Sequence, residues 1–240
     1  AVTMAENNPE QQVVFLGIGF ETTAPATAVA VELAKARGLG NFTVYSAHKL
    51  MPPALRAILG LPDLNIDGLI LPGHVSAVTG RKYFDFISDY AVPAVISGFE
   101  ACDILYAILK LVKKIHARDF SVENAYPRAV REMGNTKAMA EISKVFRPSD
   151  AFWRGLGNIP LSGLGLDTQY SSFDAKVRFG LPRVVEEPEL PGCSCAEVLS
   201  GRKTPRQCRL FGKTCTPSSP VGPCMVSSEG SCRAHYVFGR

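Results

Sequence analysis

Several familiar sequence signals are missing from this chain of 240 residues, and each absence argues against one class of protein. No apolar run reaches the roughly 18 residues that a membrane-spanning helix requires. The first residues are polar and lack the basic-then-apolar pattern of a secretory signal, so we expect a cytoplasmic protein with no membrane partner. Neither GxGxxG nor a P-loop motif occurs, so the sequence does not predict nucleotide binding.

The charge of the chain is close to balanced, with 26 Lys and Arg residues against 22 Asp and Glu residues. The basic excess lies in residues 193–240, where seven basic residues accompany two acidic ones. A basic tail can attract nucleic acid, but this one lacks the interleaved aromatic side chains on which bases stack. We therefore expect no nucleic-acid partner, and we assign the positive charge to an anionic thiolate cluster or an acidic protein partner.

Six of the seven cysteines are confined to one short segment: Cys193, Cys195, Cys208, Cys215, Cys224 and Cys232. No CxxC pair is present, so the spacing matches neither a zinc ribbon nor the cysteine run of bacterial ferredoxins. The segment is rich in Gly, Pro and Ser and can bury little core, so bonds to a metal would have to replace packing as its folding energy. An iron–sulfur cluster, a zinc ion and a disulfide or redox pair stay open, although disulfides are disfavoured in a cytoplasmic protein. The seventh cysteine, Cys102, begins an apolar helical stretch and is predicted to be a buried core residue.

Short apolar runs alternate with segments of helical composition through the first half of the chain. The runs cover residues 13–19, 42–47, 68–73 and 93–98. The helical segments cover residues 24–38, 52–60, 81–91 and 102–117. Strands that alternate with helices predict an α/β fold with one parallel sheet and helices on both faces. Because the runs are apolar throughout, we expect both faces of each strand to be buried.

The second half of the chain is less regular. We expect helical structure over residues 122–146, an irregular Gly-rich stretch at 148–166, a short helix within 171–182 and an exposed linker at 186–192. These features predict two domains. An α/β domain with a helical extension occupies residues 1–185, and an irregular carboxyl-terminal cysteine-rich module occupies residues 186–240.

Polar side chains follow each of the four predicted strands. In an open parallel sheet, the loops after the strands meet at the carboxyl edge, where ligands bind. The candidates for one cleft there are Glu21, His48, Lys49, His74, Ser76 and Glu100. Two carboxylates and two imidazoles can hold a transition metal or move protons, and we expect Glu21, His48, His74 and Glu100 to take this role. Each residue alone has an ordinary explanation as a helix cap or a solvated loop residue, so the prediction depends on their meeting at one edge.

A series of motifs, in this order along the chain, resembles one known family. The motifs are GFETTAPATA, AHKLMPPALR, LPGHVS, GFEACDIL, YPRAVREMGN, WRGLGNIPLSGL, CSCAEVLSG, CRLFGKTC and GPCMVSSEGSC. They span nearly the whole chain, and in them the sequence is similar to the hydrogenase maturation factor HypD family. The resemblance implies a 4Fe–4S cluster bound by carboxyl-terminal cysteines. It implies the ligands Cys193, Cys208, Cys215 and Cys232, with Cys195 and Cys224 as alternates.

The resemblance also implies an activity. It implies an assembly scaffold that works with the partners HypC and HypE and builds the iron centre of nickel–iron hydrogenases. Cyanide and carbon monoxide are placed there on a transiently bound iron, by a protein with redox capability rather than by a turnover enzyme in the usual sense. Family members are longer at the amino end and carry there the cysteine thought to hold the iron, so this chain, which has no initiator Met, is expected to be a fragment. From the residues alone, a zinc-stabilised α/β enzyme and an interaction module with a structural metal are the alternatives.

Overall fold

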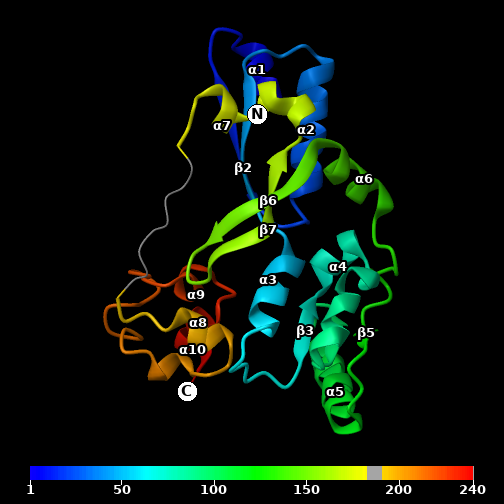
Figure 1. Ribbon diagram of the computed structural model, residues 1–240, viewed down its shortest axis with the longest axis vertical. Coiled ribbons are helices and arrows are strands. Elements are labelled where there is room, and N and C mark those ends of the chain that lie inside the picture. Colours follow the sequence, from blue (N-terminus) through cyan, green and yellow to red (C-terminus); the bar gives the residue numbers. More distant parts are fainter. Residues whose placement is uncertain (183–190, 240) are drawn as a thin grey trace. The chain divides into compact units, whose positions relative to one another are not determined.

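The computed structural model describes residues 1–182 and 191–239 of the chain (Figure 1). These residues divide into two compact units. The first unit contains residues 1–54, 68–151 and 160–182, and the second contains residues 55–67, 152–159 and 191–239. Most of the predicted linker at 186–192, and the predicted domain boundary at 185–186, lie outside the described residues.

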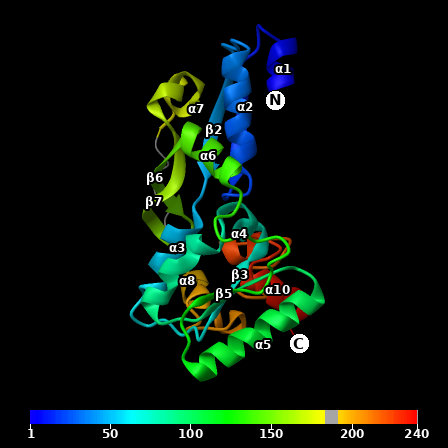
Figure 2. The ribbon, with the colours of Figure 1, turned by 90° about the vertical axis from the view of Figure 1, so that its right-hand side faces the viewer.

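A two-stranded parallel sheet in the first unit consists of β1 (Val13–Gly19) and β2 (Phe42–His48). Both strands coincide with predicted apolar runs. They are connected by α2 (Ala24–Ala36), an Ala-rich helix with a proline in its first turn, where the missing N–H of proline costs no hydrogen bond. α2 runs alongside β2 (Figure 2) and buries one of its faces there, so this crossover has the geometry expected of a parallel pair.

A second parallel sheet contains β3 (Leu69–Pro72), β4 (Ala94–Ser97) and β5 (Val122–Asn124), in that order. The prediction of one sheet through all four apolar runs is therefore wrong, although each run does form a strand. The central strand β4 is buried along its whole length, as an apolar run in a parallel sheet should be. The helices of this region are α4 (Gly73–Thr79), the 3-10 helix η1 (Arg81–Tyr90) and α5 (Ala101–Ala117).

The prediction for residues 122–182 is correct only in part. The expected helix at 122–146 is replaced by β5, a turn region and the shorter helix α6 (Thr136–Val145). The stretch expected to be irregular forms two paired strands, β6 (Phe146–Trp153) and β7 (Gly157–Leu166), which three residues join as a hairpin. The predicted short helix is present as α7 (Ala175–Arg178), preceded by the 3-10 helix η2 (Thr168–Phe173).

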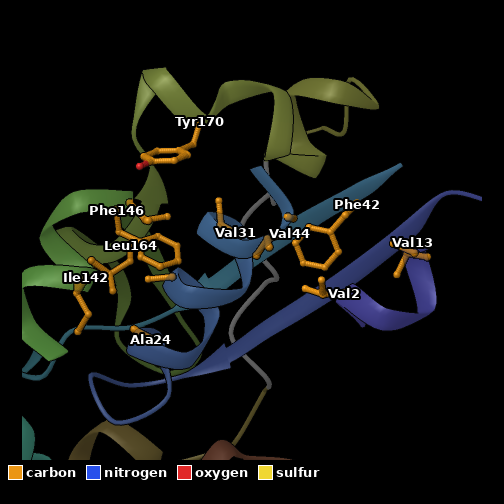
Figure 3. Packing of buried hydrophobic residues seen from close by; sticks show 14 of the residues in the cluster. Val2, Val13, Ala24, Val31, Phe42, Val44, Ile142, Phe146, Leu164 and Tyr170 are labelled. Atoms are coloured by element: carbon orange, nitrogen blue, oxygen red, sulfur yellow. The ribbon is translucent and has the colours of Figure 1, made fainter. Parts of the chain in front are cut away.

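The core of the first unit forms where α2, β2, α6, β7 and η2 meet (Figure 3). The residues labelled there are Val2, Val13, Ala24, Val31, Phe42, Val44, Ile142, Phe146, Leu164 and Tyr170. Burial of each large side chain of this kind stabilises the fold by about 1.5–3 kcal/mol. The amino-terminal helix α1 (Val2–Asn7) joins this core, and the side-chain amide of Asn41 donates to the carbonyl oxygens of Ala5 and Asn8, both at 2.9 Å.

Two apolar elements are less buried than the sequence predicts. The strand β1 exposes 61% of Leu16 and 68% of Ile18, so the expectation that both faces of every strand are buried is wrong for β1. The helix α5 exposes 66% of Leu105. Cys102, in the first turn of α5, is also exposed, which corrects its prediction as a buried core residue.

The second unit is made of short elements held by turns. Its helices are α8 (Cys195–Leu199), η3 (Pro205–Gln207), α9 (Pro223–Val226) and α10 (Ser231–Phe238), while α3 (Met51–Leu59) has residues in both units. The backbone N–H of Asn65 donates to the carbonyl of Ser200 at 2.9 Å, and its side-chain amide donates to the carbonyl of Gly201 at 3.0 Å. A Cβ at Gly201 would lie 2.1 Å from the Asn65 carbonyl, so only glycine fits at this contact.

Candidate functional site

The second unit has a core made largely of cysteine. Four buried thiols, those of Cys195, Cys215, Cys224 and Cys232, share it with apolar side chains that include the fully buried Met225. Cys193 is half-buried and packs against this core, and Cys208 is also buried. A packed group of thiols in a short, loop-rich segment is the arrangement expected where sulfur ligands supply part of the folding energy.

Short helices and turns position these thiols. Cys195 is the first residue of α8, Cys224 lies in α9, and Cys232 lies in the first turn of α10. The Sγ atoms of Cys224 and Cys232 are 3.3 Å apart. The backbone N–H of Val221 donates to the Sγ of Cys215 at 3.4 Å, so a main-chain dipole already points at this sulfur.

Two glycines lie beside the sulfur atoms. A Cβ added at Gly222 would lie 2.6 Å from the Sγ of Cys193, which no real side chain could tolerate. A Cβ at Gly155, in the hairpin turn between β6 and β7, would lie 3.7 Å from the Sγ of Cys195. The close approach to Cys193 therefore requires glycine at position 222, whereas the contact at Gly155 is an ordinary one and its positive φ of 85° is what favours glycine there.

The electrostatic environment disfavours free thiolates. Burial raises the pKa of Cys193 and of Cys232, and the thiol of Cys224, hydrogen-bonded to Cys195, raises the pKa of Cys195 together with burial. A bound metal cluster reverses this preference, because its positive iron ions stabilise the deprotonated sulfur. The six cysteines are more than the four thiolates that a 4Fe–4S cluster needs. Within the described residues, no three His, Cys, Asp or Glu side chains form a group arranged to hold one metal ion.

The first sheet positions two of the predicted polar residues, and both are buried. Glu21 is fully buried after β1, and its Oε1 accepts hydrogen bonds from the backbone N–H of Met51 at 2.8 Å and from the hydroxyl of Tyr83 at 2.9 Å. Its Oε2 has no hydrogen-bond partner in the described part of the chain. Burial raises the pKa of Glu21, and these two hydrogen bonds oppose the rise.

His48 ends β2 and is 2% exposed. Its Nε2 lies 3.0 Å from the hydroxyl of Thr27, and its Nδ1 lies 3.4 Å from the hydroxyl of Thr23. The ring edge packs against Phe146, with 5.8 Å between the ring centroids. Burial lowers the pKa of His48, so the neutral ring is favoured. A Cβ at Gly17 would lie 2.8 Å from this ring, which explains the glycine within β1.

The second sheet positions the other two predicted residues, and both are exposed. His74 lies in the first turn of α4, with its ring 5.1 Å from that of Phe99. Glu100 precedes α5 and forms an ion pair with Arg128 at 3.3 Å. Arg128 also donates to the carboxylate of Asp103, and this hydrogen bond lowers the pKa of Asp103. The loops after β3 and β4 therefore present an accessible imidazole, an aromatic ring and a charged network.

The residues predicted for one cleft differ in burial and follow strands of two sheets. Glu21 and His48 are buried at the end of one sheet, and His74 and Glu100 are exposed at the end of the other. Ser76 is buried and donates to the carbonyl of Pro72 at 2.9 Å, as an ordinary helical serine does. Lys49 is partly buried, and burial, followed by the nearby Lys176, lowers its pKa.

Sequence reasoning missed the residues that complete these sites. Tyr83, in η1, holds the buried carboxylate of Glu21 although the two residues are 62 positions apart. Arg128 lies within the motif YPRAVREMGN and connects Glu100 to Asp103, but nothing in that motif indicates these partners. The role of Gly222 had no local signal beyond turn composition, because it depends on the sulfur of Cys193 in another segment.

Comparison with known proteins places these features in context. A family model described as HypD, "Hydrogenase formation hypA family", matches residues 1–239. The "Hydrogenase maturation factor HypD2" of Bradyrhizobium diazoefficiens is 46% identical over 248 residues, which is 100% of this chain and 65% of that protein. The HypD of Cupriavidus necator is 46% identical over 100% of this chain and 65% of its own length. The HypD of Escherichia coli is 44% identical over 99% of this chain and 64% of its own length.

The chain thus spans a little under two thirds of the length of these relatives. Among the residues that the structure describes, no helix has the length and apolar character needed to cross a membrane.

Proposed function

The chain belongs to the HypD family of hydrogenase maturation factors, and from this premise we propose that it acts as an assembly scaffold carrying a 4Fe–4S cluster in the maturation of nickel–iron hydrogenase. The observation that carries the proposal is the core of buried thiols in the second unit. These side chains are in a small, loop-rich unit, where a bound cluster would add folding energy to that of the apolar side chains packed with them.

The cluster ligands in this proposal are Cys193, Cys208, Cys215 and Cys232. Cys195 and Cys224 are the alternates, and the 3.3 Å between the sulfur atoms of Cys224 and Cys232 means that a small rotation could exchange one for the other. When bound, such a cluster supplies one-electron transfer. The chain itself contributes thiolates, the N–H of Val221 directed at Cys215, and a segment with excess positive charge that offsets the charge of the anionic cluster.

The iron that receives cyanide and carbon monoxide is the cargo of this scaffold, and HypC and HypE are its proposed partners. We assign the contact with cargo or partner to the exposed pair, His74 and Glu100, because both lie in loops after strands and are open to solvent. Glu21 and His48 instead hold other elements in place, since Glu21 bonds to α3 and η1 and His48 bonds to α2. Each is buried and hydrogen-bonded to a neighbouring element, so their role is to position the backbone rather than to touch a ligand.

The decisive experiment is anaerobic purification followed by iron and acid-labile sulfide analysis. The wild-type chain should contain about four irons and four sulfides. Cys208→Ser and Cys215→Ser should each lose most of both, since a neutral serine hydroxyl is a poor replacement for a thiolate. Cys102→Ser is the matched control, because Cys102 is an exposed cysteine on α5 in the first unit and should leave the iron content unchanged.

The same analysis separates the alternatives. Wild-type iron and sulfide in both cysteine variants would remove the proposed ligand set. Zinc without sulfide in the wild-type chain would instead favour a zinc-stabilised enzyme or interaction module. Binding of HypC is tested separately, by pull-down with the wild-type chain and with His74→Ala, which should weaken capture while leaving the iron content unchanged.

A further inference from the structure

The strand β1 has the composition of an interior strand but lies at the edge of its sheet. Its sequence, VVFLGIG, is apolar throughout, a pattern typical of strands covered on both faces in a parallel sheet. Within residues 1–182 and 191–239 its one strand partner is β2, and Leu16 and Ile18 are 61% and 68% exposed. Edge strands normally carry Lys, Pro or a bulge that blocks further pairing, and β1 has none of these.

The hydrogen-bonding groups of β1 follow a simple alternation. The N–H of Val13 donates to the carbonyl of Asn41, and the carbonyl of Gly19 accepts from the N–H of Lys49, both at 2.8 Å. The backbone groups of the odd-numbered residues of β1 therefore point toward β2. In a parallel strand, the backbone N–H and C=O groups of the next residue point to the opposite edge of the strand. The N–H groups of Val14, Leu16 and Ile18 therefore lie on the other edge. In the part of the chain that the structure describes, none of these three N–H groups has a backbone partner.

The side chains of these same residues are also uncovered. The α2 helix covers the opposite face of the sheet, where a Cβ at Gly17 would meet Thr27 and His48. On the face of Val14, Leu16 and Ile18, the neighbouring strand β2 is contacted by α7, as the 4.8 Å between the Lys176 amine and the Tyr45 ring centroid shows. Over β1 the described residues leave this face open, and Val14, Leu16 and Ile18 are 42%, 61% and 68% exposed. The open edge and the open face thus belong to the same strand, so one occupant could fill both.

We propose that the open edge of β1 is a strand-docking site for the part of the HypD chain that lies outside the match to this chain. That part would add a strand parallel to β1 and an apolar element over Val14, Leu16 and Ile18. About a third of the Bradyrhizobium diazoefficiens relative lies outside the match, which is far more than the roughly 30 residues that a strand–helix–strand unit needs.

A second copy of this chain is the competing occupant. Two β1 strands related by a two-fold axis would pair antiparallel, and antiparallel strands usually alternate apolar and polar residues. The unbroken apolar run of β1 matches the interior of a parallel sheet instead, and a parallel neighbour requires a crossover connection that a third of a chain can supply.

The test is amide hydrogen exchange resolved to single residues. It compares this chain with full-length HypD2 from Bradyrhizobium diazoefficiens. In this chain the amides of Val14, Leu16 and Ile18 should exchange as fast as unprotected peptide, while those of Phe15 and Gly17 are protected. At the aligned even positions of the relative, exchange should be at least about 100-fold slower, as for hydrogen-bonded strands.

Two results would overturn the proposal. One is an equal rate of amide exchange at Val14, Leu16 and Ile18 of this chain and at the aligned residues of the relative. The other is protection of these amides in this chain alone, together with a dimeric mass in light scattering, which would assign the edge to a second copy. Neither outcome depends on iron content, which is measured on the same samples, so failure here is distinct from failure of the proposed cluster.

A fusion tests the residues of this chain directly. The unmatched third of the relative is joined to this chain in the order that the relative has. Ile18→Lys in the fusion should restore fast exchange at the Leu16 amide, by about 10-fold or more, because a charge cannot be covered by an apolar element. Leu105→Lys on α5 is the matched control, since Leu105 is 66% exposed, and it should keep the slow rate. Equal rates in the two variants would contradict the role of β1.

Discussion

Removal of one hydroxyl group, by Tyr83→Phe, should destabilise the first unit in a pH-dependent way. Tyr83 donates to Glu21 at 2.9 Å, and Glu21 is fully buried, so solvent does not screen the contact. A hydrogen bond to a charged group contributes about 1.5–3 kcal/mol, and one to a neutral group about 0.5–1.5 kcal/mol. Tyr83 itself stays protonated, because burial raises its pKa. The loss should therefore be about 2 kcal/mol at pH 8 and about 1 kcal/mol at pH 4.

The sign of this dependence follows from the raised pKa of Glu21. As pH rises above the ordinary value of 4.5, the unfolded chain releases its proton before the folded chain does, and the free energy of unfolding falls. Loss of the Tyr83 donor raises the pKa of Glu21 further, so in the variant the fall continues to higher pH. The assay is anaerobic urea unfolding at pH 4 and pH 8, followed by far-ultraviolet circular dichroism.

Tyr90→Phe is the control for this prediction. Tyr90 lies in the same 3-10 helix, and its hydroxyl makes no hydrogen bond within the part of the chain that the structure describes. Its substitution should change stability by less than about 0.5 kcal/mol at either pH. The reasoning is refuted if Tyr83→Phe costs the same at pH 4 and pH 8, or no more than Tyr90→Phe.

Two further predictions use the same unfolding assay. Because burial lowers the pKa of His48 below 6.5, the unfolded chain takes up a proton first as pH falls, and stability should drop below about pH 6.5. His48→Gln should abolish this part of the drop and the exposed His74→Gln should keep it; an unchanged profile in His48→Gln would contradict the assignment. Gly134→Ala should cost about 3–5 kcal/mol, because φ is 62° and a Cβ would lie 2.4 Å from the backbone of Gly80. Gly38→Ala, with φ of 65° and open space around it, should cost only about 1–2 kcal/mol, and equal losses would show that the steric contact is unimportant.

The sequence predicted strands well where the hydrophobic signal was strong and local. The run at 13–19 and the strand β1 coincide, because an apolar stretch between polar and glycine-rich segments has little alternative. β5 was missed because its three residues, Val-Glu-Asn, carry almost no apolar signal. The hairpin of β6 and β7 was missed because its glycines suggested irregular structure, whereas Gly155 and Gly157 serve the turn between two strands.

The pairing of strands and the burial of side chains could not be predicted from local sequence patterns. Nothing within the four apolar runs indicates that β1 and β2 form one sheet and β3 and β4 another, since that choice depends on contacts between distant segments. Glu21 was expected at an open edge, but it is buried, and Tyr83 and the N–H of Met51 bond to one oxygen of its carboxylate inside the protein. The clustering of the cysteines could be predicted, because their density in a segment unable to form its own apolar core left few other roles.

The second unit has a consequence for how the protein is made. Its three parts are residues 55–67, 152–159 and 191–239, so it closes through contacts such as that of Asn65 with Ser200. At about 5–20 residues per second of synthesis, roughly ten seconds separate these two residues on the ribosome. During this interval residues 55–67 have no partner from the cysteine segment, and closing so long a loop slows folding. The cysteine unit is thus among the last parts to fold, and any factor that delivers a group to its thiols acts on a chain whose first strands and helices already exist.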